Sequence, residues 1–259
     1  LVFLVKSSYK LPSALAAFLY LLMLCLPLDT TYAKDDISSK DMRRAVIEIN
    51  NSMVKKPTRK TLDRANQIVE YMSDSLVSNG TALCNQVSKN TRCNLGWSIK
   101  LEKNSSFNAY ATSANKVVVF TGLIDSIFYE DELAFVIAHE IGHHAHNHIA
   151  KTKRRAILGA IAGGLLGATT GDTDITSQAM NIGAGLGVLS FSVEQEVEAD
   201  RFAHDLLVMS DYNNTKARDV LIRMARDSRN ISTQLLSSHP SGPERLHYFD
   251  TYRTKFIRD

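Results

Sequence analysis

The stretch that decides the fold is an HExxH sequence, His139-Glu140-Ile141-Gly142-His143. It is preceded by three acidic residues, 130–132, and by an apolar run, 133–138. Acidic residues are favourable at the start of a helix because they oppose the helix dipole. A run that is apolar on nearly every side is typical of a buried helix. We therefore expect the HExxH sequence on a buried helix.

The two histidines of this sequence point to a metal site. Residues four apart lie on one face of a helix, one turn apart, so His139 and His143 can present imidazole nitrogens to one metal ion. Glu140 can then reach a water molecule on that ion, which is the arrangement of zinc hydrolases. The alternative is a chance match, but such a match need not fall on a helix or have a third ligand downstream.

Three more histidines follow the motif, His144, His146 and His148. His146 returns close to the azimuth of His139, but about 10 Å further along the helix axis, too far to share one tetrahedral metal. We interpret the three as helix-end residues or as hydrogen-bond partners of the metal ligands. A secondary metal site remains an alternative.

The third metal ligand is expected in the run 192–200. A catalytic zinc takes three protein ligands and keeps one position open. Glu196 and Asp200 are four apart and share a helix face, so Glu196 can coordinate while Asp200 accepts the free N–H of a ligand histidine. Glu194 and Glu198 point elsewhere on such a helix. The competing interpretation is an acidic, solvated helix face.

Together these segments resemble the M48 family of zinc metallopeptidases. The family pairs HExxH with a downstream ExxAD-type helix, here Glu196-Val197-Glu198-Ala199-Asp200. Asn108-Ala109-Tyr110-Ala111 is similar to the family's NAFA segment, and His239-Pro240 with Arg245 is similar to its HP-x4-R element. The resemblance covers about residues 40–252. The chain departs from the family pattern at 113–115, where many members have Pro-Gly, so the turn there is expected to differ.

The resemblance implies an endopeptidase with one Zn²⁺ ion per chain, held by His139, His143 and Glu196. Glu140 would take a proton from water and return it to the leaving amine. His239 would donate to the oxyanion of the tetrahedral intermediate.

The remaining site residues are also implied by the family pattern. Asp200 and Arg245 would organise the site around the ligands. Taken without the resemblance, His239 before Pro240 is interpreted as structural. A strand over Asn108 to Ala111 would bind extended substrates through its backbone, which predicts broad specificity.

The expected fold is α+β, mainly α-helical: a gluzincin-like metallopeptidase domain with a small β-sheet or hairpin beside the HExxH helix. Hydrophobic periodicity predicts the remaining elements. They are helices over 38–56, 61–77, 220–230 and 242–258, a strand at 97–101, and a hairpin over 108–121 with its turn at 112–115.

The first residues have the layout of a secretory signal. Lys6 and Lys10 precede the uncharged run 11–28, and small residues stand at the −3 and −1 positions of a cleavage site at Ala33. We expect a signal peptide over 1–33 and a single M48-type domain over 34–259. An uncleaved anchor is the alternative, since run 11–28 is long enough to span a bilayer.

Export suggests how the cysteines are used. Cys84 and Cys93 lie in a polar, Asn-rich stretch, and a loop disulfide between them is predicted. A metal pair lacks partners at zinc-finger spacing. The expected location is the periplasm of a Gram-negative bacterium, with the protein soluble or membrane-associated.

Two apolar runs, 156–168 and 179–191, are each too short to span a membrane. A helical hairpin is expected, with a mobile lid or a peripheral membrane contact as alternatives. The net charge is only +3 and no basic patch is interleaved with aromatics, so nucleic-acid binding is not predicted. The expected partners are polypeptide substrates, unfolded envelope proteins in particular. The alternative function is a latent protease that acts mainly as an envelope chaperone or assembly factor.

Overall fold

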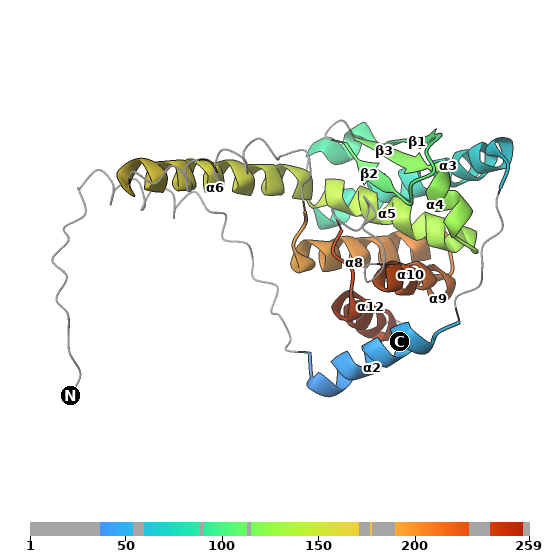
Figure 1. Cartoon of the computed structure of the whole chain (residues 1–259). Helices are drawn as coiled ribbons and strands as arrows, with labels where there is room; N and C mark the ends of the chain where they lie inside the picture. The colour runs from blue at the N-terminus through green and yellow to red at the C-terminus, as the bar shows by residue number, and fades with distance from the viewer. Residues whose placement is uncertain are drawn as a thin grey trace. The chain divides into compact units, whose positions relative to one another are not determined.

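The computed structural model describes residues 37–53, 60–88, 91–112, 115–170, 177, 190–227 and 239–255. Within these ranges the chain is mainly helical with one small sheet, which confirms the predicted fold class (Figure 1). The predicted signal segment lies outside the described residues. So do turn residues 113–114 and most of the second apolar run.

Helices are present where the sequence predicts them, with shifted ends, and the short helices α4 and α9 are additional to the prediction. Their bounds are α2 Ser39–Asn51, α3 Leu62–Val87, α4 Thr121–Ser126, α5 Glu130–Ala145, α6 His148–Thr170, α8 Val193–Met209, α9 Asn214–Ala217, α10 Asp219–Asp227 and α12 Pro243–Lys255. The HExxH sequence lies on α5. The first apolar run lies within α6, so a helix is confirmed there.

The sheet has the order β1-β3-β2, with strands β1 Ser98–Glu102, β2 Ala109–Ala111 and β3 Lys116–Phe120. β1 runs parallel to β3, with Ile99 opposite Val117. β2 runs antiparallel to β3, with Tyr110 opposite Val118, which confirms the predicted hairpin. β2 is therefore an edge strand of this sheet.

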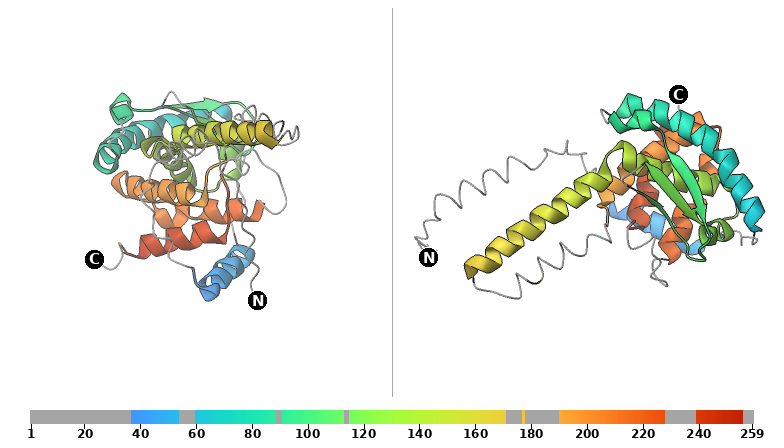
Figure 2. Two further views of the ribbon diagram at one scale, coloured as in Figure 1. Left: turned by 90° about the vertical axis from the view of Figure 1, so that its left-hand side faces the viewer. Right: turned by 90° about the horizontal axis from the view of Figure 1, so that it is seen from above.

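The described helices and strands are stacked in layers. The sheet lies on one side of α5 and α8 lies on the other, with α12 and then α2 beyond α8 (Figures 1 and 2). Every residue of α5 from Glu132 to Ala145 is buried, as the apolar run before the motif predicts. The HExxH helix is thus the centre of the core.

The cysteine prediction is half right. Cys84 and Cys93 form a disulfide, and both are buried. The predicted loop is wrong, because Cys84 lies in the last turn of α3 and Cys93 in a 3₁₀-helix, Thr91–Leu95. Helix α3 runs past Val77 because Gly80, a loop signal in sequence, packs closely against α5 and α8: a Cβ there would lie 3.4 Å from Ile141.

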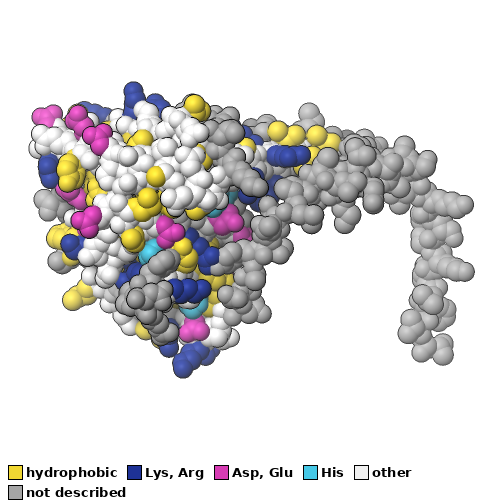
Figure 3. All heavy atoms as spheres, turned by 180° about the vertical axis from the view of Figure 1, so that it is seen from behind, with side chains coloured by type: hydrophobic (Ala, Val, Ile, Leu, Met, Phe, Trp, Pro, Cys, Tyr) yellow, Lys and Arg dark blue, Asp and Glu magenta, His cyan; other side chains and the backbone are white. Residues whose placement is uncertain are grey.

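The described surface carries mixed charge. Basic and acidic side chains are interspersed over the face in Figure 3. No helix within the described ranges combines the length and hydrophobicity needed to cross a membrane.

Candidate metal centre

Helix α5 is fixed at its start by a buried carboxylate. Glu132 accepts hydrogen bonds from the backbone N–H groups of Phe128 and Tyr129, at 2.9 and 3.0 Å. Its other oxygen lies 3.2 Å from the guanidinium of Arg223 on α10. These bonds satisfy N–H groups ahead of the first turn and neutralise the buried charge. They set the rotation of α5, and with it the direction in which the motif points.

His144 fixes the other end of α5 to the sheet. The indole N–H of Trp97 donates to His144 Nδ1 at 2.7 Å, so Nε2 carries the ring proton in neutral His144. That nitrogen donates to the carbonyl of Thr112, at the end of β2. His144 is therefore a helix-end anchor, one of the roles predicted for it.

Helix α8 is positioned by its cap and by a close helix contact. Ser192 and Gln195 form a capping box, which begins α8 one turn before Glu196. Gly142 lets α5 approach α8: a Cβ at this position would lie 3.1 Å from the Cα and carbonyl oxygen of Ala199. The glycine inside the motif thus brings Glu196 within reach of the two histidines.

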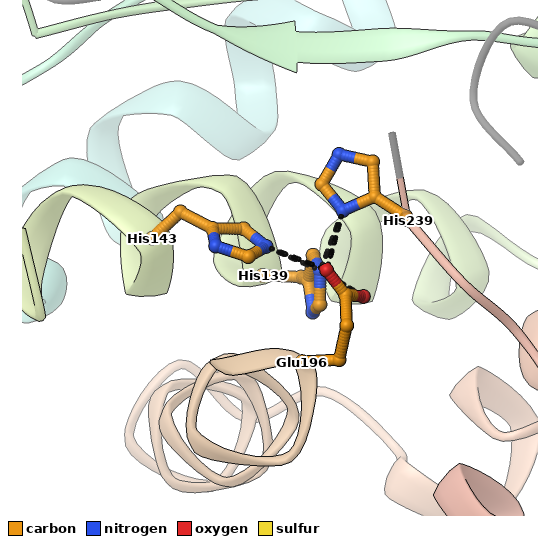
Figure 4. A group of neighbouring side chains, drawn as sticks. All are labelled: His139, His143, Glu196 and His239. Carbon is orange, nitrogen blue, oxygen red and sulfur yellow. Dashed lines mark hydrogen bonds and ion pairs between the residues drawn. The ribbon is translucent and has the colours of Figure 1, made fainter. Parts of the chain in front are cut away.

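Four buried side chains converge between α5, α8 and the segment before α12 (Figure 4). His139, His143, Glu196 and His239 each offer one nitrogen or oxygen atom, and these four atoms lie within 4.8 Å of one another. The Nε2 atoms of His139 and His143 are 2.9 Å apart, and each lies 3.4 Å from a Glu196 oxygen. The structure therefore brings together all three predicted ligands and His239.

The outer side of His139 faces a charged pair. His139 Nδ1 lies 2.9 Å from Asp200 Oδ1, as the spacing of Glu196 and Asp200 predicts. Arg245 binds both Asp200 oxygens, at 2.6 and 2.8 Å, and its third nitrogen lies 2.6 Å from Glu196 Oε2. The guanidinium thus links the two carboxylates of α8, and all of these side chains are buried.

The outer side of His143 faces His148, one of the three histidines that follow the motif, and two residues that sequence reasoning did not place at the site, Glu198 and Phe191. His143 Nδ1 lies 3.0 Å from His148 Nδ1, and His148 Nε2 lies 2.9 Å from Glu198 Oε2. The ring of Phe191 stacks on that of His143, with centroids 3.9 Å apart. The contact of His148 with His143 agrees with one of the two roles predicted for it, that of a hydrogen-bond partner of a metal ligand. Phe191 was noted in sequence only as the end of the second apolar run.

Charge and burial set the protonation of the ligands. Burial would raise the pKa of Glu196, but Arg245 and the neighbouring histidines hold it well below its usual value. Burial would lower the pKa of His139, but the carboxylates of Glu196 and Asp200 raise it to about 9. Burial holds the pKa of His143 well below its usual value. The centre contains an ionised carboxylate among imidazoles whose proton affinities differ.

Glu140 lies beside this group on the sheet side. Its Oε1 atom lies 3.3 Å from His239 Nε2, and the backbone of Ala111 on β2 hydrogen-bonds to its carboxylate. Burial raises the pKa of Glu140, and His239 and His139 offset part of that rise. Glu140 is thus a buried carboxyl with a raised proton affinity, fixed next to the converging nitrogens.

The outer edge of strand β2, which pairs with no other strand among the described residues, lies at this place. The carbonyl of Asn108 accepts from Phe120 N–H, and Thr112 N–H donates to the carbonyl of Lys116, so these alternate residues pair with β3. The backbone groups of Ala109 and Ala111 between them point away from β3. The predicted edge strand is therefore adjacent to Glu140.

The donor set fits a zinc ion. Two imidazoles and a carboxylate in one small buried volume match the nitrogen and oxygen ligands that zinc takes in catalytic sites. Each histidine of the HExxH motif has its outer nitrogen next to a partner, Asp200 for His139 and His148 for His143, and its Nε2 atom turned to the common point. Partners on the outer nitrogen are a regular feature of metal-binding histidines.

Comparison with known proteins agrees with this chemistry. Residues 81–252 match Peptidase family M48. The chain is 30% identical over 152 residues to the mitochondrial metalloendopeptidase OMA1 of Arabidopsis thaliana, covering 58% of this chain and 30% of that protein. It is 29% identical over 148 residues to the metalloprotease LoiP of Escherichia coli K12, covering 54% and 56%.

A third relative is the beta-barrel assembly-enhancing protease of Yersinia pestis, 29% identical over 158 residues, which cover 56% of this chain and 32% of that protein. The matched stretch thus spans between 30% and 56% of the length of these relatives. The family match includes α5, α8 and the HP-x4-R element. This chain belongs to Peptidase family M48.

Proposed function

We propose that this chain is a zinc-dependent endopeptidase in which His139, His143 and Glu196 hold one zinc ion. The observation that carries the proposal is the convergence of their donor atoms in a buried volume beside an edge strand. When bound, zinc would polarise the scissile carbonyl and lower the pKa of water at the site.

In this proposal Glu140 is the general base. It takes a proton from the attacking water and delivers it to the leaving amine. Burial raises the pKa of Glu140, which brings its proton affinity closer to that needed near neutral pH. The bond from the Ala111 backbone holds one side of the carboxylate, so its orientation is fixed relative to β2.

Substrate binding is assigned to the free edge of β2. An extended peptide can add to this edge through the backbone groups of Ala109 and the carbonyl of Ala111, which point away from β3, while the Ala111 N–H stays on Glu140. Main-chain pairing requires no particular side chain, so we expect broad sequence tolerance. It does require an extended backbone, so the substrates are unfolded or locally unfolded polypeptides.

The substrate class we propose is exported proteins of the cell envelope. The relatives of this chain include proteases named for beta-barrel assembly. Residues 1–33 have the layout of a secretory signal, which supports a location of this chain beside such substrates, in the periplasm of a Gram-negative bacterium.

The test uses the purified chain, the variant Glu140→Gln and the control Glu194→Gln. Glu194 lies on α8 but is exposed, so its substitution removes one carboxylate without touching the centre. We expect one zinc ion in all three proteins, and cleavage of unfolded casein by the parent and the control alone. A folded parent without zinc would refute the proposal.

One observation favours a second candidate function, a latent protease that acts mainly as an envelope chaperone or assembly factor. His239 Nδ1 lies 3.3 Å from His139 Nε2 and 3.1 Å from Glu196 Oε1, so this ring stands among the metal donors. A fourth protein ligand there would take the place that water needs.

The variant His239→Ala separates the two functions. If His239 donates to the oxyanion, its removal should lower casein cleavage roughly 100-fold or more. If it occupies the fourth position, removal should raise cleavage above that of the parent. In both cases the zinc content stays near one ion, because the other three ligands remain.

A further inference from the structure

His143 has a partner on its outer nitrogen that neither the proposed mechanism nor the family motifs require. His148 Nδ1 lies 3.0 Å from His143 Nδ1, and both rings are fully buried. The inference drawn from this contact rests on the proposed zinc centre, in which His143 binds metal through Nε2.

The contact exists because the chain breaks between α5 and α6. In a continuous α-helix, a residue five positions after His143 would point about 140° away from it. The break is at Asn147, which has a positive φ of 58°. Asparagine tolerates this left-handed conformation better than most residues. The break turns His148, the first residue of α6, toward the ring of His143.

The hydrogen bonds fix where the ring protons lie. A carboxylate only accepts, so the 2.9 Å contact between His148 Nε2 and Glu198 Oε2 places a proton on Nε2. A neutral His148 then has a lone pair on Nδ1 and can accept from His143. His143 must donate from its own Nδ1, which leaves its Nε2 with a lone pair for the metal.

We propose that His148 and Glu198 are positioning residues that hold His143 in the metal-binding tautomer and orientation. The relay runs from the Glu198 carboxylate through the two His148 nitrogens to His143. It is the counterpart of the single step from Asp200 to His139 on the other side of the centre. The ring of Phe191, stacked on His143, holds the plane of the same imidazole.

The nearby His146 admits a different use of these residues. Donor atoms of His146, His148 and Glu198 lie within 4.8 Å of one another, a spacing that a second metal ion can bridge. We favour the relay because both nitrogens of His148 already have partners at hydrogen-bond distance. A second ion would have to displace the proton on His148 Nε2. The two interpretations differ in zinc stoichiometry.

The test measures zinc affinity of the full chain by competition with a chelator, beside zinc content. The variants are His148→Phe, which keeps a ring but has no nitrogen, and Glu198→Ala. Their matched controls are His146→Phe, two residues before His148, and Glu194→Ala, on α8 like Glu198. Neither control residue belongs to the relay. We expect zinc Kd to rise roughly 10- to 100-fold in the relay variants and less than about 3-fold in the controls.

The double variant separates a relay from two unrelated contacts. Residues that act through one chain are not additive, so the double variant should bind zinc about as weakly as His148→Phe alone. Nitrogen NMR of the zinc-loaded parent should show His143 protonated at Nδ1 and His148 at Nε2. Additive losses, the opposite tautomers, or unchanged affinity in His148→Phe would overturn the relay.

Zinc content distinguishes the remaining outcomes. Two ions in the parent, falling to one in His146→Phe, would overturn the relay in favour of a second metal site. A parent that binds one zinc tightly but cleaves nothing would refute the proposed endopeptidase and leave the relay to be judged on affinity. Circular dichroism of each variant verifies that it is folded.

Discussion

The two histidines of the HExxH motif, His139 and His143, are held by different kinds of interaction. On the His139 side, Asp200 and Arg245 form a charged pair whose side chains are each only 2% exposed. On the His143 side, a histidine and a carboxylate make hydrogen bonds, and the carboxylate, Glu198, is 32% exposed. One side is a closed ionic network, and the other opens to solvent at its far end.

This difference predicts different sensitivities. In a buried ionic network each partner depends on the others, because removal of one leaves an uncompensated charge in a poor solvent for ions. A hydrogen-bonded relay that ends near water can recruit solvent when a member is lost. Substitutions on the charged, His139 side should therefore cause large losses of stability. Substitutions on the relay, His143 side should cause smaller losses.

The largest effect is expected from Arg245→Met. The substitution keeps an unbranched apolar stem but removes the guanidinium, so the carboxylates of Glu196 and Asp200 lose their shared cation. We expect a loss of about 3–5 kcal/mol in the free energy of unfolding. Urea unfolding of the purified protein measures it.

The control for Arg245→Met is Arg44→Met. Arg44 forms an ion pair with Asp41 at 3.5 Å, but its side chain is 69% exposed. Exposed pairs of this kind contribute about 1 kcal/mol or less. If both variants lost similar stability, the contrast between the two sides of the centre would be wrong.

A second prediction concerns the loss of stability at acid pH through His146, which lies next to the relay. Burial lowers the pKa of His146 to about 4, and His148 and Lys151 add to this while Glu198 opposes it. Folded protein then binds fewer protons than unfolded protein, in which the value is 6.5. The contribution of His146 to the free energy of unfolding is fully present above pH 6.5. It is lost as the pH drops toward 4, and the loss is at most about 3 kcal/mol.

The variant His146→Phe tests this, because it removes the titrating group and keeps a ring near Phe202. Melting temperatures of parent and variant are compared at pH 7, 6 and 5. The parent should lose more stability between pH 7 and pH 5 than the variant does. Equal losses would assign the acid sensitivity to other groups.

The two sides of the centre also differ in how much of their structure could be predicted from the sequence. The charged side was predictable, because Glu196 and Asp200 are spaced by four on one helix and the HP-x4-R element supplies Arg245. Helical spacing is a local rule that placed Glu196 and Asp200 on one face, and the family resemblance then supplied their roles and Arg245. On the relay side the sequence offered His148 only as one of three histidines that could be helix-end residues or partners of a ligand, because His148 reaches His143 only through a backbone break. A single asparagine in the left-handed region is not distinguishable in sequence from an asparagine in a helix.

The fold shows the same limit. The buried HExxH helix and the hairpin followed from the apolar run and from alternation. The continuation of α3 through Gly80 did not, because glycine is a loop signal locally and a packing device in contact with Ile141 and Leu206. Tertiary contact decided the conformation there, and no spacing within the segment reports it.

A third prediction moves both sides of the centre together. Gly142→Ala adds a Cβ at 3.1 Å from the backbone of Ala199, so α5 and α8 must separate by a few tenths of an ångström. Overpacking of this kind costs about 1–3 kcal/mol. Zinc affinity should fall with stability, since Glu196 moves away from both histidines. Unchanged affinity would mean that the helix contact does not position the third ligand.

The smallest effect is expected at the break, and it tests the relay without touching a titratable group. Asn147→Ala places a Cβ-bearing residue with no polar side chain at φ 58°, which costs about 1–2 kcal/mol. Asn147→Gly adopts the same conformation freely and should be nearly neutral. If the break orients His148, zinc affinity should weaken in the alanine variant and be retained in the glycine variant. Equal affinity in both would show that His143 is held without help from α6, so that the two sides of the centre differ less than their contacts suggest.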